Sequence, residues 1–318
     1  MNQAAPHPNR SFWKNVFLSP REARLRAGWR LAIQTVLLLI LWVGSAFPIS
    51  MLYTVFHLKI TSATYLALST LIELLGITAS VYLARRFLDH RSFTSLGLAL
   101  DRRLLPDLLA GGAITFIMMG ALYLAMRALG WIQFLGYAWP FHPLPEVVGQ
   151  TLLYFIILVF VGWQEELLSR GYHLQTIASG INLFWGVMIS ALIFAALHVT
   201  NPYFNLASLI GIFLAGLFLA FAYLRTGRLW LSIGLHIGWN FFEGVVFGFP
   251  VSGIATFPLI RLAISGPPLW SGGAFGPEAG LILLPALLIG ALLVDQYARR
   301  RIRLVSETRP TLPASPAK

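Results

Sequence analysis

The chain contains no cysteine among its 318 residues. Disulfide bonds, thiolate metal sites, cysteine nucleophiles and cysteine-linked lipid anchors are therefore excluded on this chain. Charged residues are also scarce, because Asp, Glu, Lys and Arg together make up 11% of the sequence, against about 25% in a typical soluble domain. Hydrophobic residues make up 57%. This composition indicates an integral membrane protein.

The sequence also lacks a polar segment long enough to fold as a separate soluble domain. A helix that crosses a bilayer needs about 20 apolar residues, and eight stretches approach that length. We therefore expect an all-α polytopic membrane protein in which a single transmembrane domain covers 31–303. A tail of 1–30 precedes it, and a Pro-, Ser- and Thr-rich tail of 304–318 follows and is expected to be disordered. The predicted helices are 31–55, 62–84, 104–126, 149–170, 183–199, 203–224, 229–249 and 279–296.

Acidic residues number 12 against 23 basic ones, which gives a net charge of +11. If both termini lie on one side of the membrane, that side carries 20 of the 23 basic residues, and only Lys59, Arg127 and Arg261 lie opposite. This bias places the basic loops and both termini in the cytoplasm. A basic face of this kind suits a bilayer with anionic headgroups. We expect no nucleic-acid partner. Residues 1–30 do not resemble a signal peptide, so we predict an uncleaved anchor at 31–55 and a multi-pass protein of a bacterial-type plasma membrane.

Three polar groups interrupt the predicted helices. A charged side chain near the bilayer centre costs roughly 2.5–3.5 kcal/mol on insertion scales, so such residues usually mark a function. Glu73 is a further acidic residue, but it stands alone in the second predicted helix. The three groups are Glu165 and Glu166 with Arg170, Phe194 with His198, and His236 with Asn240.

The residue types in these groups are those of a hydrolytic site. Glu166 and Arg170 are four residues apart and can pair on one helical face, whereas Glu165 points elsewhere. A carboxylate and a histidine can activate water, and a histidine with an asparagine can donate hydrogen bonds to an oxyanion. Taken singly, each group is also explained as a structural ion pair, a hydrogen-bonded core histidine or an interhelical hydrogen-bond cluster.

The order and spacing of the three groups resemble the CPBP family of intramembrane proteases. This family includes the type II CAAX prenyl endopeptidases and bacteriocin-processing or self-immunity proteins. The family pattern EExxxR is EELLSR at 165–170, FxxxH is FAALH at 194–198, and HxxxN/D is HIGWN at 236–240. The segment RSFTSLGL at 91–98 resembles an element that family members carry before the third helix. The resemblance is closest over about 150–250.

The resemblance implies an eight-helix fold that hydrolyses peptide bonds of membrane-associated proteins or peptides, as in CAAX-type processing. By the same likeness, Glu165 with His198 would activate water, and His236 with Asn240 would stabilise the oxyanion. Glu166 and Arg170 would hold the site. Family members are commonly called metalloproteases, although a metal-free, glutamate-dependent mechanism has also been argued.

Zinc is the one cofactor that the sequence leaves open. Glu165, His198 and His236 could supply three zinc ligands, but the HExxH arrangement of many zinc proteases is absent. We favour water activated without a catalytic metal and expect no other cofactor.

Two other functions fit the same polar residues. A proton- or solute-coupled transporter would use them as a relay, but it predicts two related halves, which the sequence does not show. A non-catalytic membrane scaffold would use them to hold helices together.

The predicted topology places His198 in conflict with the other site residues. At a rise of 1.5 Å per residue, Glu165 and His236 would lie about 7–10 Å from the cytoplasmic edge, where we expect the site. His198 would lie nearer the far side. The protease hypothesis requires these residues to meet.

Overall fold

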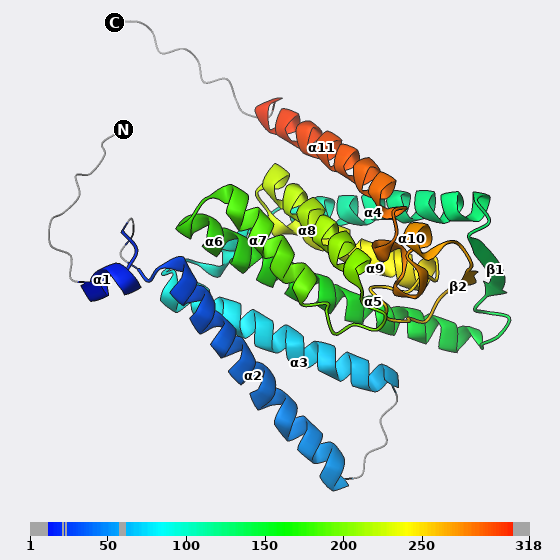
Figure 1. Ribbon diagram of the computed structural model, residues 1–318, viewed down its shortest axis with the longest axis horizontal. Coiled ribbons are helices and arrows are strands. Elements are labelled where there is room, and N and C mark those ends of the chain that lie inside the picture. Colours follow the sequence, from blue (N-terminus) through cyan, green and yellow to red (C-terminus); the bar gives the residue numbers. More distant parts are fainter. Residues whose placement is uncertain (1–11, 21, 23, 57–61, 308–318) are drawn as a thin grey trace, which may run out of the picture.

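Long apolar runs of the sequence form long helices in the computed structural model, which describes residues 12–20, 22, 24–56 and 62–307. Figure 1 shows these helices as an elongated bundle, in which α2 diverges from the rest. The helices of three or more turns are α2 (Ala27–Phe56), α3 (Ser62–Leu83), α4 (Leu104–Ala128), α5 (Leu144–Glu166), α7 (Leu183–Ala196), α8 (Leu206–Thr226), α9 (Leu229–Asn240) and α11 (Leu283–Glu307). Shorter helices are α1 (Phe12–Phe17), α6 (Leu174–Gly180) and α10 (Pro268–Ser271).

Five helical segments of the described chain are long and apolar enough to cross a membrane, and α7 is a shorter apolar helix. This confirms a mostly helical membrane protein with several spans, whereas the number eight and the cytoplasmic termini stay predictions. One part of the all-α prediction is wrong, because β1 (Ile132–Tyr137) and β2 (Ile260–Ile264) form an antiparallel pair. The five segments are 27–45, 64–88, 104–128, 144–180 and 206–226.

Several helix ends differ from the predicted ones. The second helix of the chain, α2, begins at Ala27 rather than at 31, so part of the predicted N-terminal tail is helical. At the other end α11 continues to Glu307, past the predicted boundary at 303. The remainder of the two predicted tails, 1–11 and 308–318, lies outside the described residues.

The segment that carries Glu165 is longer than the predicted 149–170 helix. From α5 it continues through a π-helical stretch, η3 (Leu167–His173), into α6, which makes one apolar segment of 144–180. The chain then turns at 181–182, where the Asn182 side chain caps α7 by accepting a hydrogen bond from the Trp185 N–H at 3.0 Å. Glu165 lies fifteen residues before Gly180, and His198 lies fifteen residues after Leu183. Both are therefore roughly 22 Å from the turn at 1.5 Å per residue, and the conflict over the depth of His198 disappears.

Ion pairs join several chain segments at one end of the bundle. Arg228, before α9, contacts Asp101 near the start of α4 at 2.5 Å. Arg301 of α11 contacts Asp107 of α4 at 3.2 Å. In Figure 1, α1 and the C-terminal end of α11 also lie toward this end. These basic loops thus gather at one end of the bundle, whereas the side of the membrane that this end faces stays a prediction.

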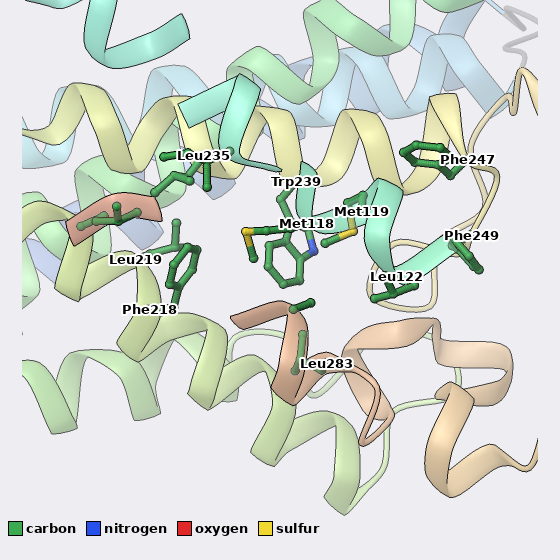
Figure 2. Packing of buried hydrophobic residues seen from close by; sticks show 14 of the residues in the cluster. Met118, Met119, Leu122, Phe218, Leu219, Leu235, Trp239, Phe247, Phe249 and Leu283 are labelled. Carbon is green, nitrogen blue, oxygen red and sulfur yellow. The ribbon is translucent and has the colours of Figure 1, made fainter. Parts of the chain in front are cut away.

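The hydrophobic core surrounds α9, in which eleven of twelve residues are buried. Figure 2 shows the side of the core where α9 faces α4, α8 and the start of α11. The packed side chains there include Met118, Met119, Phe218, Leu219, Leu235, Trp239 and Leu283. A helix enclosed in this way holds His236 and Asn240 in fixed positions.

Glycines of both helices, among them Gly111, Gly234 and Gly238, let α4 and α9 approach closely. A Cβ atom added at Gly111 of α4 would lie 2.4 Å from the Leu235 backbone nitrogen. A Cβ atom added at the neighbouring Gly112 would meet nothing within 4 Å. The two adjacent glycines therefore form a matched pair for testing this contact.

We expect Gly111→Ala to destabilise the protein by about 1–3 kcal/mol, because α4 and α9 must separate to admit the methyl group. Gly112→Ala should be neutral or stabilise by up to about 1 kcal/mol, because alanine favours the helix. Thermal unfolding of both variants in detergent measures the difference. Equal melting temperatures would contradict the close helix contact.

Candidate active site

The polar residues singled out in the sequence lie in or shortly after α5, α7 and α9. Glu165 and Glu166 end α5, His198 follows the last residue of α7 by two positions, and His236 and Asn240 lie in α9. Directly after Glu166 and directly after Asn240 the backbone changes from α to π geometry, in η3 and in η4 (Phe241–Val246). Such π-helical turns are rare overall, but those that occur often lie at functional sites.

Glu165 faces both imidazoles. Its Oε2 atom lies 3.8 Å from Nε2 of His198 and 3.8 Å from Nε2 of His236. Within the described part of the chain, Oε2 is buried and accepts no hydrogen bond. A separation above 3.5 Å between polar groups commonly holds a bridging water. The structure thus brings the predicted base and both histidines together around a space where one water can contact all three.

The outer nitrogen of each imidazole fixes the ring. Nδ1 of His198 lies 2.8 Å from the carbonyl oxygen of Phe194. Because a carbonyl only accepts, we assign the hydrogen of the neutral His198 ring to Nδ1. Nδ1 of His236 lies 2.9 Å from Oε1 of Glu166, which leads to the same assignment. In the neutral rings, Nε2 of both histidines therefore presents a lone pair toward Glu165.

Glu166 and Arg170 form the ion pair that their spacing predicts. Arg170 donates from NH1 to Oε1 of Glu166 at 2.6 Å and from NH2 to the carbonyl oxygen of Gly216 at 2.9 Å. Its guanidinium also lies over the Phe194 ring, 4.3 Å from the centroid. Glu166 is 0% exposed and Arg170 is 1% exposed, so neither charge is compensated by water. The ion pair contacts the site through the hydrogen bond between Glu166 and His236.

Asn240 lies one helical turn after His236 and is buried. Both residues line the cavity that holds Glu165 and His198. All six residues proposed from the sequence are thus in or directly behind one site.

The site opens into a cavity of about 600 Å³. This volume is within the range of about 300–1,000 Å³ that is usual for small-molecule pockets. Its walls are mostly apolar and include residues of α2, α3 and α5, such as Trp42, Leu66 and Ile157. Glu73, which stands alone in the sequence, also lines this cavity and accepts a hydrogen bond from Gln164 Nε2 at 3.0 Å. The carboxylate at 73 therefore belongs to the surroundings of the site.

Glu278 is a residue of this cavity that the sequence did not indicate. Its Oε2 accepts hydrogen bonds from the backbone N–H of Ser252 at 2.7 Å and from the Ser252 hydroxyl at 2.5 Å, and its Oε1 accepts from Trp239 Nε1 at 3.1 Å. Burial raises the pKa of Glu278, while the bonds from Ser252 and the imidazoles of His198 and His236 oppose that shift. The site thus contains another acid close to both histidines.

The loop that carries Glu278 is held firmly against the bundle. A Cβ atom at Gly211 of α8 would lie 1.7 Å from the Glu278 carbonyl oxygen. Ser252 has a φ of +47°, a conformation that costs energy in a non-glycine residue and clusters at functional sites. Glu278 lies in a segment rich in Gly and Pro, where no helical periodicity could assign it to the site. The sequence feature that could have pointed to Glu278 is its charge, because the rest of 262–294 is uncharged.

The zinc ligand set considered from the sequence does not fit this geometry. Two imidazole nitrogens and a carboxylate oxygen are suitable donors, but ligand atoms on a tetrahedral zinc lie about 3.3 Å apart. The observed separations from Glu165 are 3.8 Å. Among the described residues, no group of three or more His, Asp or Glu side chains is placed to hold a metal ion. We therefore derive no step through a metal.

Comparison with known proteins places the same helices in a family. Residues 147–242 match the family model described as type II CAAX prenyl endopeptidase Rce1-like. An uncharacterized 24.3 kDa protein of Escherichia coli is 34% identical over 96 residues, which make up 30% of this chain and 42% of that protein. The chain therefore spans less than half the length of this curated relative. The family match contains all six predicted site residues and supports a CAAX-type intramembrane protease at the level of the family.

Proposed function

This chain belongs to the CPBP family through its residues 147–242, and on that premise we propose that it is an intramembrane endopeptidase with Glu165 as general base. The observation that carries the proposal is the position of Glu165 Oε2, which is 3.8 Å from both imidazole Nε2 atoms. Three hydrogen-bond acceptors then face one space. A water molecule supplies two donors, for Glu165 and His198, and His236 becomes a donor itself when it is protonated.

Water activation begins with Glu165. The carboxylate accepts one hydrogen of the water, and Nε2 of His198 accepts the other, which directs an oxygen lone pair at the substrate carbonyl. Attack forms the new C–O bond as the proton passes to Glu165. Glu165 can then return this proton to the leaving amine when the C–N bond breaks. General acid–base assistance of this kind contributes about 10²–10⁴-fold to a rate.

His236 and Asn240 stabilise the oxyanion that forms during the attack. The Asn240 amide can donate a hydrogen bond from the cavity wall, and His236 can donate from Nε2 when it is protonated. Glu166 supports the protonated ring, because its Oε1 accepts from Nδ1 at 2.9 Å. Glu166 and Arg170 thus act on the reaction through His236 as positioning residues. Donors fixed before the reaction are commonly the largest single contribution to catalysis.

The substrate is a peptide segment that reaches the site from the membrane. The cavity that adjoins the proposed site is lined mostly by apolar side chains. A membrane-associated protein or peptide with an apolar segment beside its scissile bond suits this lining. CAAX-type processing is the reaction that the family match favours.

Cleavage of a membrane-peptide library in water enriched in ¹⁸O tests this function. The purified full-length protein should release fragments whose new carboxyl terminus carries one ¹⁸O atom, because the oxygen comes from water. A transporter would move a solute across vesicles without producing fragments. A scaffold would produce neither fragments nor flux, and either result would overturn the proposal.

We also expect Glu278→Gln to lower kcat about tenfold or more while the protein stays folded. The variant removes the charge near both histidines and weakens charge-assisted hydrogen bonds from Ser252 and Trp239. Glu146→Gln, which replaces an exposed acid in the first turn of α5, is the control. Unchanged kcat in Glu278→Gln would remove this residue from the site.

A further inference from the structure

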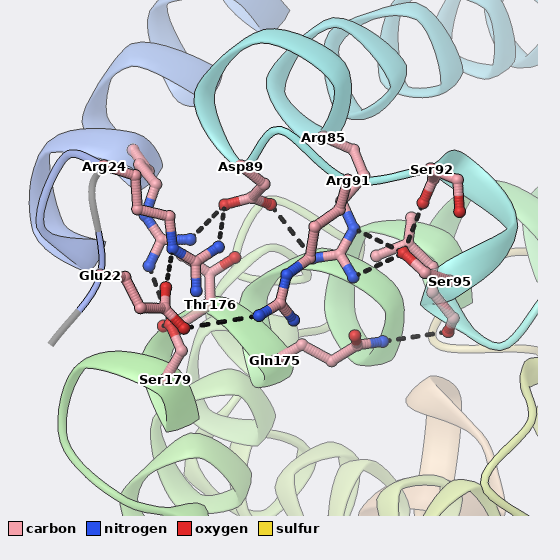
Figure 3. Close-up of polar contacts among 12 residues, drawn as sticks. Glu22, Arg24, Arg85, Asp89, Arg91, Ser92, Ser95, Gln175, Thr176 and Ser179 are labelled. Carbon is pink, nitrogen blue, oxygen red and sulfur yellow. Dashed lines mark hydrogen bonds and ion pairs between the residues drawn. The ribbon is translucent and has the colours of Figure 1, made fainter.

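A second cluster of charged residues lies away from the proposed site, at the end of the bundle where the basic loops gather. Arg24 and Arg30 precede and begin α2, Arg85 lies in the π-helical stretch η1 (Ala84–Leu88), and all three contact the carboxylate of Asp89. Figure 3 shows the side chains of Arg24 and Arg85 converging on Asp89. Asp89 is 3% exposed, and the three arginines are each 7% exposed or less.

The charges of this cluster do not balance. Arg91 extends the cluster at its rim and contacts Glu22 at 3.4 Å, as Figure 3 shows. Among the described residues, Asp89 and Glu22 are the acids paired with these four arginines. Removing charges from water is costly unless each is compensated. An excess of buried positive charge therefore calls for an additional anion.

A cavity is present where such an anion would bind. It has a volume of about 260 Å³ and is lined by all four arginines together with residues of α6, including Gln175 and Ser179. Ser179 accepts a hydrogen bond from Arg30 NH2 at 2.8 Å. The volume is slightly below the range of about 300–1,000 Å³ for drug-sized ligands, so it suits a compact polar group.

The arginines retain donors for a ligand. A guanidinium has five N–H donors, and Asp89 accepts from one terminal nitrogen of each of Arg24, Arg30 and Arg85. Arg30 Nε is buried and has no hydrogen-bond partner among the described residues. Planar guanidinium groups match the oxygens of a phosphate in pairs. The donors therefore favour a phosphate over a spherical anion.

We propose that this cavity, between α2, η1 and α6, binds a phosphate group, with Arg30 and Arg85 beneath it and Arg91 at its rim. The phosphate can belong to an anionic lipid headgroup or be free in solution, because both present the same oxygens. The proposed site is separate from the peptidase site. Ser179 lies fourteen residues after Glu165 along the 144–180 segment, or roughly 21 Å at 1.5 Å per residue.

Thermal unfolding of the full-length protein in a neutral detergent tests this site without any activity measurement. The probes are inorganic phosphate, short-chain phosphatidylglycerol and, as the zwitterionic comparison, short-chain phosphatidylcholine. We expect phosphatidylglycerol to raise the melting temperature in a saturable manner, and phosphatidylcholine to have a much smaller effect. Equal stabilisation by inorganic phosphate would identify the phosphate alone as the ligand, whereas no effect of phosphate would identify the lipid.

Two neighbouring arginines provide the variant and its control. Arg91→Gln should weaken the apparent affinity about tenfold, because it removes a charge-assisted contact. Arg86→Gln should leave the affinity unchanged, because Arg86 is exposed and does not line the cavity. Arg91 is half-exposed, so its replacement spares the buried ion pairs. The proposal is overturned if neither probe stabilises the wild type, or if both variants weaken binding equally.

Discussion

Replacing Glu165 by glutamine is expected to lower kcat for peptide cleavage by about 10²–10⁴-fold. The amide has nearly the shape of the carboxylate but cannot accept a proton from water. Its Oε2 position lies 3.8 Å from both imidazoles and makes no hydrogen bond within the described chain. The substitution should therefore leave the melting temperature nearly unchanged while activity is lost. Steady-state cleavage of a fluorogenic membrane peptide measures the rate.

Glu146 provides the matched control for this variant, because it lies on the same helix, α5, but is exposed. Glu146→Gln should cleave at the wild-type rate. Wild-type cleavage by Glu165→Gln would show that another group takes the proton. The assignment of Glu165 as general base would then be wrong, even if the protein is a protease.

Replacing Arg170 by methionine is expected to destabilise the protein by about 3–5 kcal/mol, because it leaves the carboxylate of Glu166 buried without its cation. Glu166 and Arg170 are 2.6 Å apart and almost inaccessible to water. Arg170 also holds η3 to α8 through the carbonyl of Gly216. Chemical unfolding in mixed detergent micelles measures the loss.

Arg86→Met is the control for this prediction, because Arg86 is exposed and the same charge is removed. The double variant Arg170→Met with Glu166→Gln should recover part of the stability, because the uncompensated charge is gone. If Arg170→Met is as stable as Arg86→Met, the ion pair does not support the site as we describe it.

The sequence was sufficient to single out six residues that the fold brings close together, because each is polar in a segment that is otherwise apolar. Glu165, His198 and His236 stand out for this reason, although they come from three separate helices. The Glu166–Arg170 pair also follows from helical spacing alone. These inferences need only local rules of helix geometry and the cost of charge in a membrane.

The depth of His198 could not be predicted, because it depends on where α5 ends. The predicted end at 170 overlooked the π-helical stretch η3, through which the helix continues to Gly180. A change from α to π geometry inside a helix does not alter the hydropathy pattern of its residues. Glu278 was missed for a different reason, since its position depends on a loop that the close approach at Gly211 fixes. Contacts between distant segments of this kind arise only in the folded chain.

The central claim is that Glu165 and His198 act together on one water molecule, and a double-mutant cycle on kcat tests it most directly. Residues that act as a unit show strongly non-additive losses. The variants are Glu165→Gln, His198→Ala and the two combined, each checked for folding. Our account predicts that the double variant is about as slow as the slower single variant. Losses that multiply in the double variant would show that the two residues act independently, and would contradict the shared site.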